Sequence, residues 1–409
     1  MIDAAASPSP RPFDLTIEPP VTVAKKHELQ LLRAAVARNP QSVPLRRNLA
    51  NVLLPLDQFD EVIAILEPLV EQAADFVTLN MLAEAYISRE TPEDDVAAGE
   101  TAVRAQQLAR SPYEQAKAMA AGAKALSRQG RKGEARRLLV AALEVDPTNV
   151  NAYKRLAALD LEAGDAAGLL RASDRLLDQG VAHARLIVAR ALALGTLGRI
   201  DEARATIGLD DFLHQEIVTP PSGWSDLAAF NLALKHEIMA HPDLRYDRYG
   251  TASSNSWRVD TPARAVAPAV LALQQHISAV VRDYVARVDV IDAPWVRARP
   301  PAAELHNWCV MTDADGFETW HVHQNGWLSG VYYVDVPPAV ADGRGIEGCI
   351  AFGLPENLVG KDMAALYGER LVRPLPGMMM LFPSHTYHRT FAHGSDHRRI
   401  CLAFDIQPR

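Results

Sequence analysis

The sequence of 409 residues has few cysteines and no long hydrophobic run. Its three cysteines, Cys309, Cys349 and Cys401, are an odd number with spacings that suit neither a disulfide framework nor a zinc site. We therefore expect a reducing compartment, the cytoplasm. No stretch approaches the roughly 18–20 uncharged apolar residues that cross a bilayer. Residues 265–281 are the most apolar, but polar residues such as His276 interrupt them, which predicts a buried helix.

Positive charge is also in short supply. The chain has 42 Lys and Arg against 50 Asp and Glu, a net charge of −8, so a broad nucleic-acid-binding surface is not expected. A membrane partner is not expected either, and the oligomeric state is left open. Residues 1–20 lack the basic and apolar regions of a signal peptide. Their Pro, Ser and Ala content predicts a disordered lead-in over residues 1–24.

The two halves of the chain differ in composition. All six tryptophans lie after residue 223, whereas the first half is rich in Ala, Leu, Arg and Glu with helical periodicity. Turn-forming residues at 208–223 mark the boundary. We therefore expect a helical region at 25–207 and a second domain at 208–409.

The first half repeats itself. Gly130, Gly164 and Gly198 are 34 residues apart, and 34 residues is the length of a helix–turn–helix repeat. Glycine suits the turn because a positive φ costs it little. Residues 25–207 resemble tetratricopeptide repeats, although the usual aromatic signature positions are largely absent, and a generic antiparallel helical array is the alternative. Either one predicts a solenoid whose concave face holds a peptide or protein.

The second half predicts short strands. Residues 327–336, 378–382 and 399–406 are rich in β-branched and aromatic side chains and are separated by Gly and Pro turns. This pattern favours an antiparallel barrel or jelly roll, with its core at about 300–409.

A possible metal site lies in this half. On a strand, residues two apart point to the same face, so His321 and His323 present two imidazoles to one point. Convergent nitrogen ligands are what a transition metal needs. The third ligand must come from elsewhere, and residues 383–388 offer His385 and His388 just after a strand.

Three sequence blocks around these histidines, residues 321–337, 373–388 and 398–405, resemble 2-oxoglutarate-dependent Fe(II) oxygenases. They are most similar to a bacterial and phage group that shares H-x-H, S-G-V-Y-Y, P-G, L-F-P-S, a distal His and R-I. The resemblance implies a double-stranded β-helix, Fe(II) and 2-oxoglutarate as cosubstrate. It implies that His321 is the first iron ligand and His388 the distal one, with His323 where most relatives have Asp or Glu.

The resemblance also implies a residue that holds the cosubstrate. In the family, an arginine on the strand after the distal histidine binds the far carboxylate of 2-oxoglutarate, which suits a bidentate guanidinium. Arg399 fits, with Cys401 in place of the usual hydroxyl residue, and Arg398 is the second choice. Tyr333 or Tyr332 is a candidate second contact, or an ordinary core aromatic.

The histidine at position 323 is a departure from the common triad of two His and one carboxylate. Three neutral imidazoles leave both charges of Fe(II) uncompensated until the dianionic cosubstrate binds. In the alternative, iron is held by His321 and His388 alone, as in aspartyl/asparaginyl β-hydroxylases, which lack the carboxylate and pair repeats with an oxygenase domain. We expect direct ligation by His323.

These features predict a 2-oxoglutarate- and O2-dependent Fe(II) hydroxylase acting on a peptide, protein or amino-acid side chain that the repeats recruit. A cupin-type metalloenzyme without 2-oxoglutarate is one alternative, because residues 316–323 and 383–388 partly match cupin motifs. However, residues 324–333 hold none of the glutamate expected there. A non-catalytic repeat scaffold is the other alternative.

Overall fold

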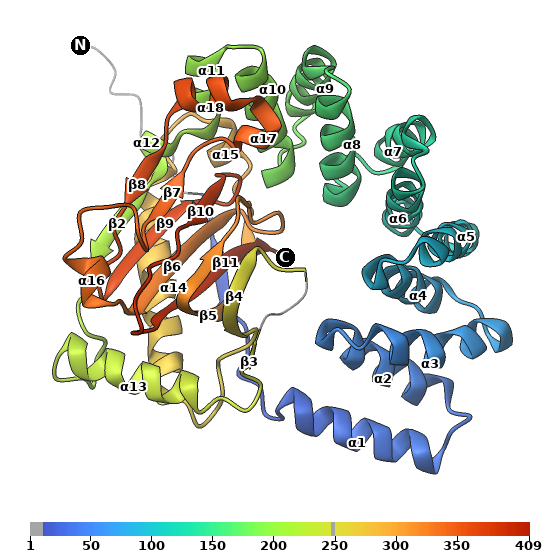
Figure 1. The fold of residues 1–409 in the computed structure, drawn as a ribbon, viewed down its shortest axis with the longest axis horizontal. Helices are drawn as coiled ribbons and strands as arrows, with labels where there is room; N and C mark the ends of the chain where they lie inside the picture. The colour runs from blue at the N-terminus through green and yellow to red at the C-terminus, as the bar shows by residue number, and fades with distance from the viewer. Residues whose placement is uncertain (1–10, 247–249) are drawn as a thin grey trace.

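The computed structural model describes residues 11–246 and 250–409. An arc of helices lies beside a β-sheet domain, as Figure 1 shows. Both parts of the expected fold class are confirmed, since the helices belong to the first half of the chain and nearly all strands to the second. Within the described residues, no helix is both long and apolar enough to cross a membrane.

The arc consists of helices that each pack against the next one in the chain. Several begin at a side chain that accepts a hydrogen bond from the first turn, such as Ser42, Asp75 and Asn149. The helices are α1 (Lys25–Arg38), α2 (Val43–Leu53), α3 (Phe59–Gln72), α4 (Phe76–Arg89), α5 (Pro92–Leu108), α6 (Pro112–Arg128), α7 (Lys132–Val145), α8 (Val150–Glu162), α9 (Ala166–Asp178), α10 (Ala184–Thr196) and α11 (Ile200–Ile207), with a short 3-10 turn at Leu54–Leu56.

The repeat glycines occupy the turns for which the 34-residue spacing predicts them. Gly130, Gly164 and Gly198 have φ angles of 78°, 75° and 73°, a conformation that other residues adopt only at a cost. Small residues such as Ala118 and Ala125 are completely buried between helices, which lets the helix backbones approach closely.

Two sheets form the second domain. The larger has the order β2-β9-β6-β11-β5-β4-β3, with β1 also pairing with β5, and the smaller has the order β10-β7-β8. All pairs are antiparallel except β1 with β5. The strands are β1 (Asp14–Ile17), β2 (His214–Ile217), β3 (Arg245–Tyr246), β4 (Ser253–Val259), β5 (Ala302–Glu318), β6 (Leu328–Asp335), β7 (Ile350–Phe352), β8 (Arg370–Val372), β9 (Met378–Pro383), β10 (His388–Thr390) and β11 (Arg399–Pro408).

The larger sheet has two different faces. Ile400, Leu402 and Phe404 of β11 lie in the core that the sheet shares with the covering helices. The alternate residues face the smaller sheet, as the period of two requires. The remaining helices are α12 (Leu209–Phe212), α13 (Leu227–Met239), α14 (Pro268–Val288), α15 (Pro294–Arg297), α16 (Pro338–Ala341), α17 (Glu356–Val359) and α18 (Lys361–Tyr367).

The expected buried helix is present in this domain, and the expected pair of sheets is present without barrel closure. The apolar segment predicted as a buried helix is the first part of α14, and Leu273, Ile277 and Val281 on it are completely buried. The strands form the two facing sheets of a double-stranded β-helix, but among the described residues their pairings do not close into a barrel.

The segment before the repeats is part of the second domain. β1 pairs in parallel with the start of β5, from Asp14 opposite Ala302 to Ile17 opposite Leu305. The prediction of a disordered lead-in over residues 1–24 is therefore wrong for this strand, because main-chain hydrogen bonding to a distant strand outweighs the local composition. Residues 1–10 lie outside the described residues.

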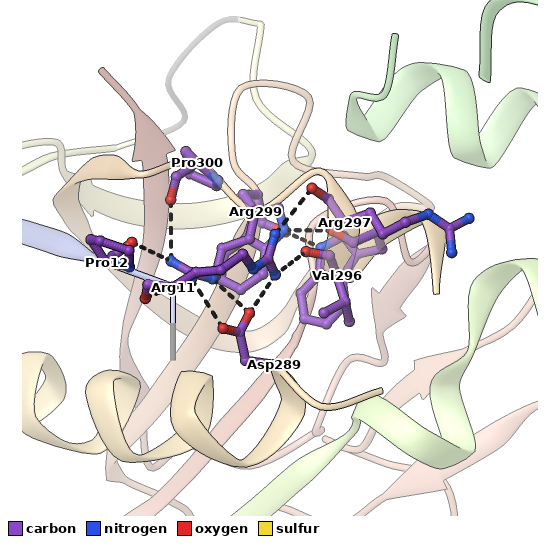
Figure 2. Close-up of polar contacts among 9 residues, drawn as sticks. Arg11, Pro12, Asp289, Val296, Arg297, Arg299 and Pro300 are labelled. Atoms are coloured by element: carbon purple, nitrogen blue, oxygen red, sulfur yellow. Dashed lines mark hydrogen bonds and ion pairs between the residues drawn. The ribbon is translucent and has the colours of Figure 1, made fainter. Parts of the chain in front are cut away.

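A buried ion pair fixes this segment, as Figure 2 shows. Arg299 donates to both carboxylate oxygens of Asp289, at 2.9 and 3.1 Å, and to the backbone carbonyls of Arg11 and Pro12. Arg11 in turn contacts Asp289 and donates to the carbonyl of Val296. The helical arc therefore starts from, and returns to, the sheet domain.

The other end of the arc packs on the sheet domain through an apolar cluster. Val188 and Leu192 of α10 meet Val322 and Tyr387 from two loops of the second domain. Gly195 of α10 permits the contact, since a Cβ atom there would come within 2.8 Å of a methyl group of Leu354.

Candidate metal centre

Two segments of the second domain bring three histidines together. His321 and His388 exchange backbone hydrogen bonds of 3.0 and 3.1 Å, and the backbone N–H of His323 donates to the carbonyl of Ser384 at 3.0 Å. The rings of His321 and His323 lie on the same side of the extended segment, and Val322 between them packs against the helical arc. One ring nitrogen from each of the three histidines lies within 4.8 Å of the others.

Each ring is held through its Nδ1 atom. That atom lies 2.8 Å from the carbonyl of Thr319 in His321 and 3.0 Å from the carbonyl of Thr386 in His388. Carbonyl oxygens can only accept a hydrogen bond, so Nδ1 donates in both rings. The Nε2 lone pair of each ring is then available to a metal.

The third ring is held by a carboxylate. Nδ1 of His323 lies 2.6 Å from Oδ1 of Asp405, which also accepts a 2.7 Å hydrogen bond from the hydroxyl of Ser329. Asp405 is only 6% exposed. A carboxylate behind a histidine orients the ring and raises its basicity as a ligand. This pair therefore supplies, one residue away from the metal position, the negative charge that three imidazoles lack.

Asp405 is a residue of the site that was not predicted from the sequence, although the sequence contains a signal for it. Arg399, Cys401 and Ala403 share one face of β11, and Asp405 is the next residue of that face. The period of two therefore placed it on the side of the site, but the partner of its carboxylate depended on tertiary structure.

The neutral protonation state of two of the rings favours metal binding. Burial lowers the pKa of His388 well below its usual value, and burial likewise lowers the pKa of His321. Both rings are therefore neutral at neutral pH and need not lose a proton to bind a metal. Three imidazole nitrogen donors, one backed by a carboxylate, fit a divalent transition metal such as Fe(II).

Arg399 lies in the same cavity. Its guanidinium donates to the carbonyl of Gly348 at 3.0 Å and to the hydroxyl of Thr390 at 3.2 Å, and the residue is 2% exposed. In the described part of the chain no carboxylate lies within ion-pair distance of it. Arg398 points to the other side of the strand, where it bonds Asp313 at 2.7 Å.

Tyr333 also lines this cavity, whereas the hydroxyl of Tyr332 bonds Asn231 on the opposite face of the sheet. Burial raises the pKa of Tyr333, so its hydroxyl stays protonated and can donate. Burial raises the pKa of Cys401 to about 12, which keeps its thiol neutral beside Arg399.

Glu318 is a second residue that the sequence did not reveal. It ends β5, lines the cavity, and accepts a 3.2 Å hydrogen bond from Ser253. Burial alone would raise the pKa of Glu318, but His321 and Arg399 nearby bring it below its usual value, so the carboxylate is ionised. The cavity has a volume of about 30 Å³, roughly that of one water molecule. A five-carbon diacid therefore needs some lining side chains to move.

His385, His393 and His397 have other partners. His385, the alternative third ligand, donates from Nε2 to the carbonyl of Ile207 at 3.0 Å, and burial lowers its pKa to about 4. It joins the sheet domain to the end of the helical arc. His393 bonds the carbonyl of Thr312, and His397 bonds Asp335.

Comparison with known families adds two matches. Residues 306–405 match the family described as "Putative 2OG-Fe(II) oxygenase", and residues 29–85 match the tetratricopeptide repeat. The first match covers the three histidines and Arg399. A search of curated proteins found no matching sequence.

Solved structures resemble each half separately. A Pseudomonas putida prolyl-4-hydroxylase is 15% identical, covering 52% of this chain and 99% of its own, with a TM-score of 0.32. HygX from Streptomyces hygroscopicus, solved with nickel, 2-oxoglutarate and hygromycin B, is 15% identical. The match covers 50% of this chain and 86% of HygX, with a TM-score of 0.33. A tetratricopeptide repeat protein from Thermus thermophilus is 22% identical. The match covers 42% of this chain and 90% of that protein, with a TM-score of 0.34.

These scores are too low to carry an argument, so the assignment depends on the family matches and the sequence blocks. Residues 306–405 are therefore similar to the 2OG-Fe(II) oxygenases, and residues 29–85 are similar to the tetratricopeptide repeats.

Proposed function

We propose that this protein is an Fe(II)- and 2-oxoglutarate-dependent dioxygenase that hydroxylates a side chain of a peptide or protein held by the helical arc. One observation carries the proposal. Three histidines with free Nε2 atoms share a small buried cavity with Arg399, a cation that has no carboxylate within 4.0 Å among the described residues.

His321, His323 and His388 would hold the iron. Bound there, iron would activate O2, one oxygen atom of which would hydroxylate the substrate while the other would oxidise 2-oxoglutarate to succinate and CO2. The chain's own residues position these reactants. Asp405 keeps the ring of His323 in its ligating orientation, and the hydrogen bonds to Thr319 and Thr386 do the same for the other two rings.

Arg399 would bind the far carboxylate of 2-oxoglutarate. It is already held by Gly348 and Thr390, so little side-chain freedom is lost when the carboxylate binds. Tyr333 would donate a further hydrogen bond from the neighbouring strand. The apolar side chains of Ile350 and Phe382 line the same cavity and exclude water from it.

The test is succinate formation from 2-oxoglutarate by the purified full chain with Fe(II), ascorbate and O2. We expect His321→Ala and His388→Ala to lose both iron binding and turnover. Arg399→Ala should still bind iron but require much more 2-oxoglutarate, and Arg398→Ala is the matched control that should behave as wild type.

The outcomes separate the candidate functions. Metal binding with no dependence on 2-oxoglutarate would favour a cupin-type enzyme. Absence of both metal binding and turnover would favour a repeat scaffold. Retained turnover in either histidine variant would contradict the ligand assignment.

A further inference from the structure

A groove of about 510 Å³ lies between the helical arc and the sheet domain. Its walls come from α4, α6 and α8, and Gln324 and Asn325, which directly follow the candidate ligand His323, complete it. Figure 1 shows the arc of helices, α4, α6 and α8 among them, beside the sheets. The groove is therefore placed between the recruiting part and the reacting part of the molecule.

Five cations gather at this groove. Lys117, Lys124 and Arg155 line it, and Lys154 and Arg185 lie close enough to Arg155 to repel it electrostatically. Only two carboxylates, those of Glu84 and Asp146, line the same groove. The concentration of positive charge is unusual because the whole chain has a net charge of −8.

These cations lack partners that other cations of the arc have. Within residues 11–246 and 250–409, none of the five is within 4.0 Å of a carboxylate. By contrast, Arg128, Arg136 and Arg190 of neighbouring positions in the arc each form an ion pair. Other cations of the arc that form no ion pair among the described residues, such as Arg104 and Arg137, are exposed to solvent, whereas Lys117, Lys124, Arg155 and Arg185 are partly buried.

Arg155 shows how unfavourable this arrangement is without a ligand. Its Nε atom is buried and has no hydrogen-bond partner among the described residues, and an unsatisfied buried donor destabilises the folded state. Burial and the neighbouring cations lower the pKa of Arg155 to about 10. Burial, Arg128 and Arg155 lower the pKa of Lys124 to about 8, although Glu90 and Asp95 act in the opposite direction. Burial and the cations Arg185, Arg155 and Lys124 lower the pKa of Lys154 to about 8 as well.

The groove adjoins a second cavity. Arg185 donates to the side-chain oxygen of Gln324 at 3.3 Å, and Gln324 also lines an adjoining cavity of about 290 Å³. His183 lines that second cavity. Its Nδ1 accepts a hydrogen bond from the backbone of Leu186, so its Nε2 carries the proton, and that buried N–H has no acceptor in the part of the chain that the structure describes.

We propose that this groove binds an acidic segment of the substrate protein, so that the oxygenase selects targets in acidic sequence. Carboxylates of such a segment would pair with Lys124 and Arg155, and the amides of Asn80 and Asn151 are placed to bond its backbone. The inference depends on the proposed function for the fate of the bound segment. A peptide fits better than a nucleic acid, because stacking aromatics, on which single strands depend, are represented in the lining by Tyr113 alone.

The experiment measures fluorescence anisotropy of labelled 12-residue probes with the full-length protein, in the absence of 2-oxoglutarate. The probes are a Glu/Asp-rich peptide, its Gln/Asn counterpart and an oligothymidylate. We expect the acidic peptide to bind at least tenfold more tightly than the neutral one, and this difference to shrink with added salt.

The variant Lys124→Gln/Arg155→Gln should lose at least tenfold in affinity for the acidic peptide. Arg104→Gln/Arg137→Gln is the matched control, since these exposed arginines of α5 and α7 lie outside the groove lining. If the groove variant does not fold, Lys117→Gln/Lys154→Gln replaces it, with the same expected loss. Equal binding of the acidic and neutral peptides, tighter binding of the oligothymidylate, or full affinity in the groove variants would overturn the proposal.

The two proposals fail separately. Acidic-peptide binding without any succinate formation would leave the groove assignment standing and refute the oxygenase. Succinate formation without a preference for the acidic peptide would do the reverse.

Discussion

The pair between Asp405 and His323 makes a quantitative prediction about metal affinity. The carboxylate is buried, lies 2.6 Å from Nδ1 of the ring, and accepts a second hydrogen bond from Ser329. Removal of such a partner behind a ligating histidine typically lowers metal affinity by about 10- to 100-fold. Asp405→Asn keeps an acceptor oxygen and loses the charge, so we expect about tenfold, and Asp405→Ala about 100-fold.

Anaerobic titration with Fe(II), or with Co(II) as a coloured substitute, measures this affinity. Asp335→Asn is the matched control, because Asp335 also pairs with a histidine, His397, at 2.9 Å but lies outside the cavity lining. It should bind metal as the wild type does. Thermal melting without metal should show a further loss of stability in Asp405→Ala of about 1–3 kcal/mol, because it leaves Ser329 and His323 without their buried acceptor.

A double-mutant cycle decides whether Asp405 acts through His323. If it does, His323→Ala/Asp405→Ala will bind metal no more weakly than His323→Ala alone. Wild-type affinity in both Asp405 variants would refute direct ligation by His323 and leave iron on His321 and His388. Additive losses would refute the mechanism and indicate that Asp405 acts on the site in another way.

Three further predictions concern the cavity, the groove and the contact between domains. Glu318→Gln should strengthen 2-oxoglutarate binding by roughly three- to tenfold, because a like charge is removed, and should leave metal affinity unchanged; loss of metal in calorimetry would instead make Glu318 a ligand. Acidic-peptide affinity should fall between pH 7 and pH 9, because Lys124 and Lys154 lose their protons near pH 8; anisotropy that stays constant over this range would contradict their role. Gly195→Val should destabilise the protein by about 1–3 kcal/mol in urea unfolding, since its Cβ would approach Leu354 within 2.8 Å, and an unchanged midpoint would show that the contact yields freely.

Local pattern predicted much of the architecture. The 34-residue spacing of the glycines predicts the turns of the repeats, because a positive φ is a property of one residue and its neighbours. Strand alternation likewise predicts that His321 and His323 share a side and that Arg399 and Arg398 point to opposite faces of β11, and the structure places them so. These features depend only on backbone periodicity, which a sequence displays directly.

The tertiary structure decided which distant groups meet. His385 and His388 are three residues apart, yet one bonds the end of the helical arc and the other joins the histidine cluster. Asp405 became a partner of His323 through strand register, and the segment at Asp14–Ile17 became a strand because β5 offered a free edge. The cations of the groove come from three helices and lie close together only because the repeats curve. Each of these outcomes depends on contacts between residues far apart in the chain, which no local pattern encodes.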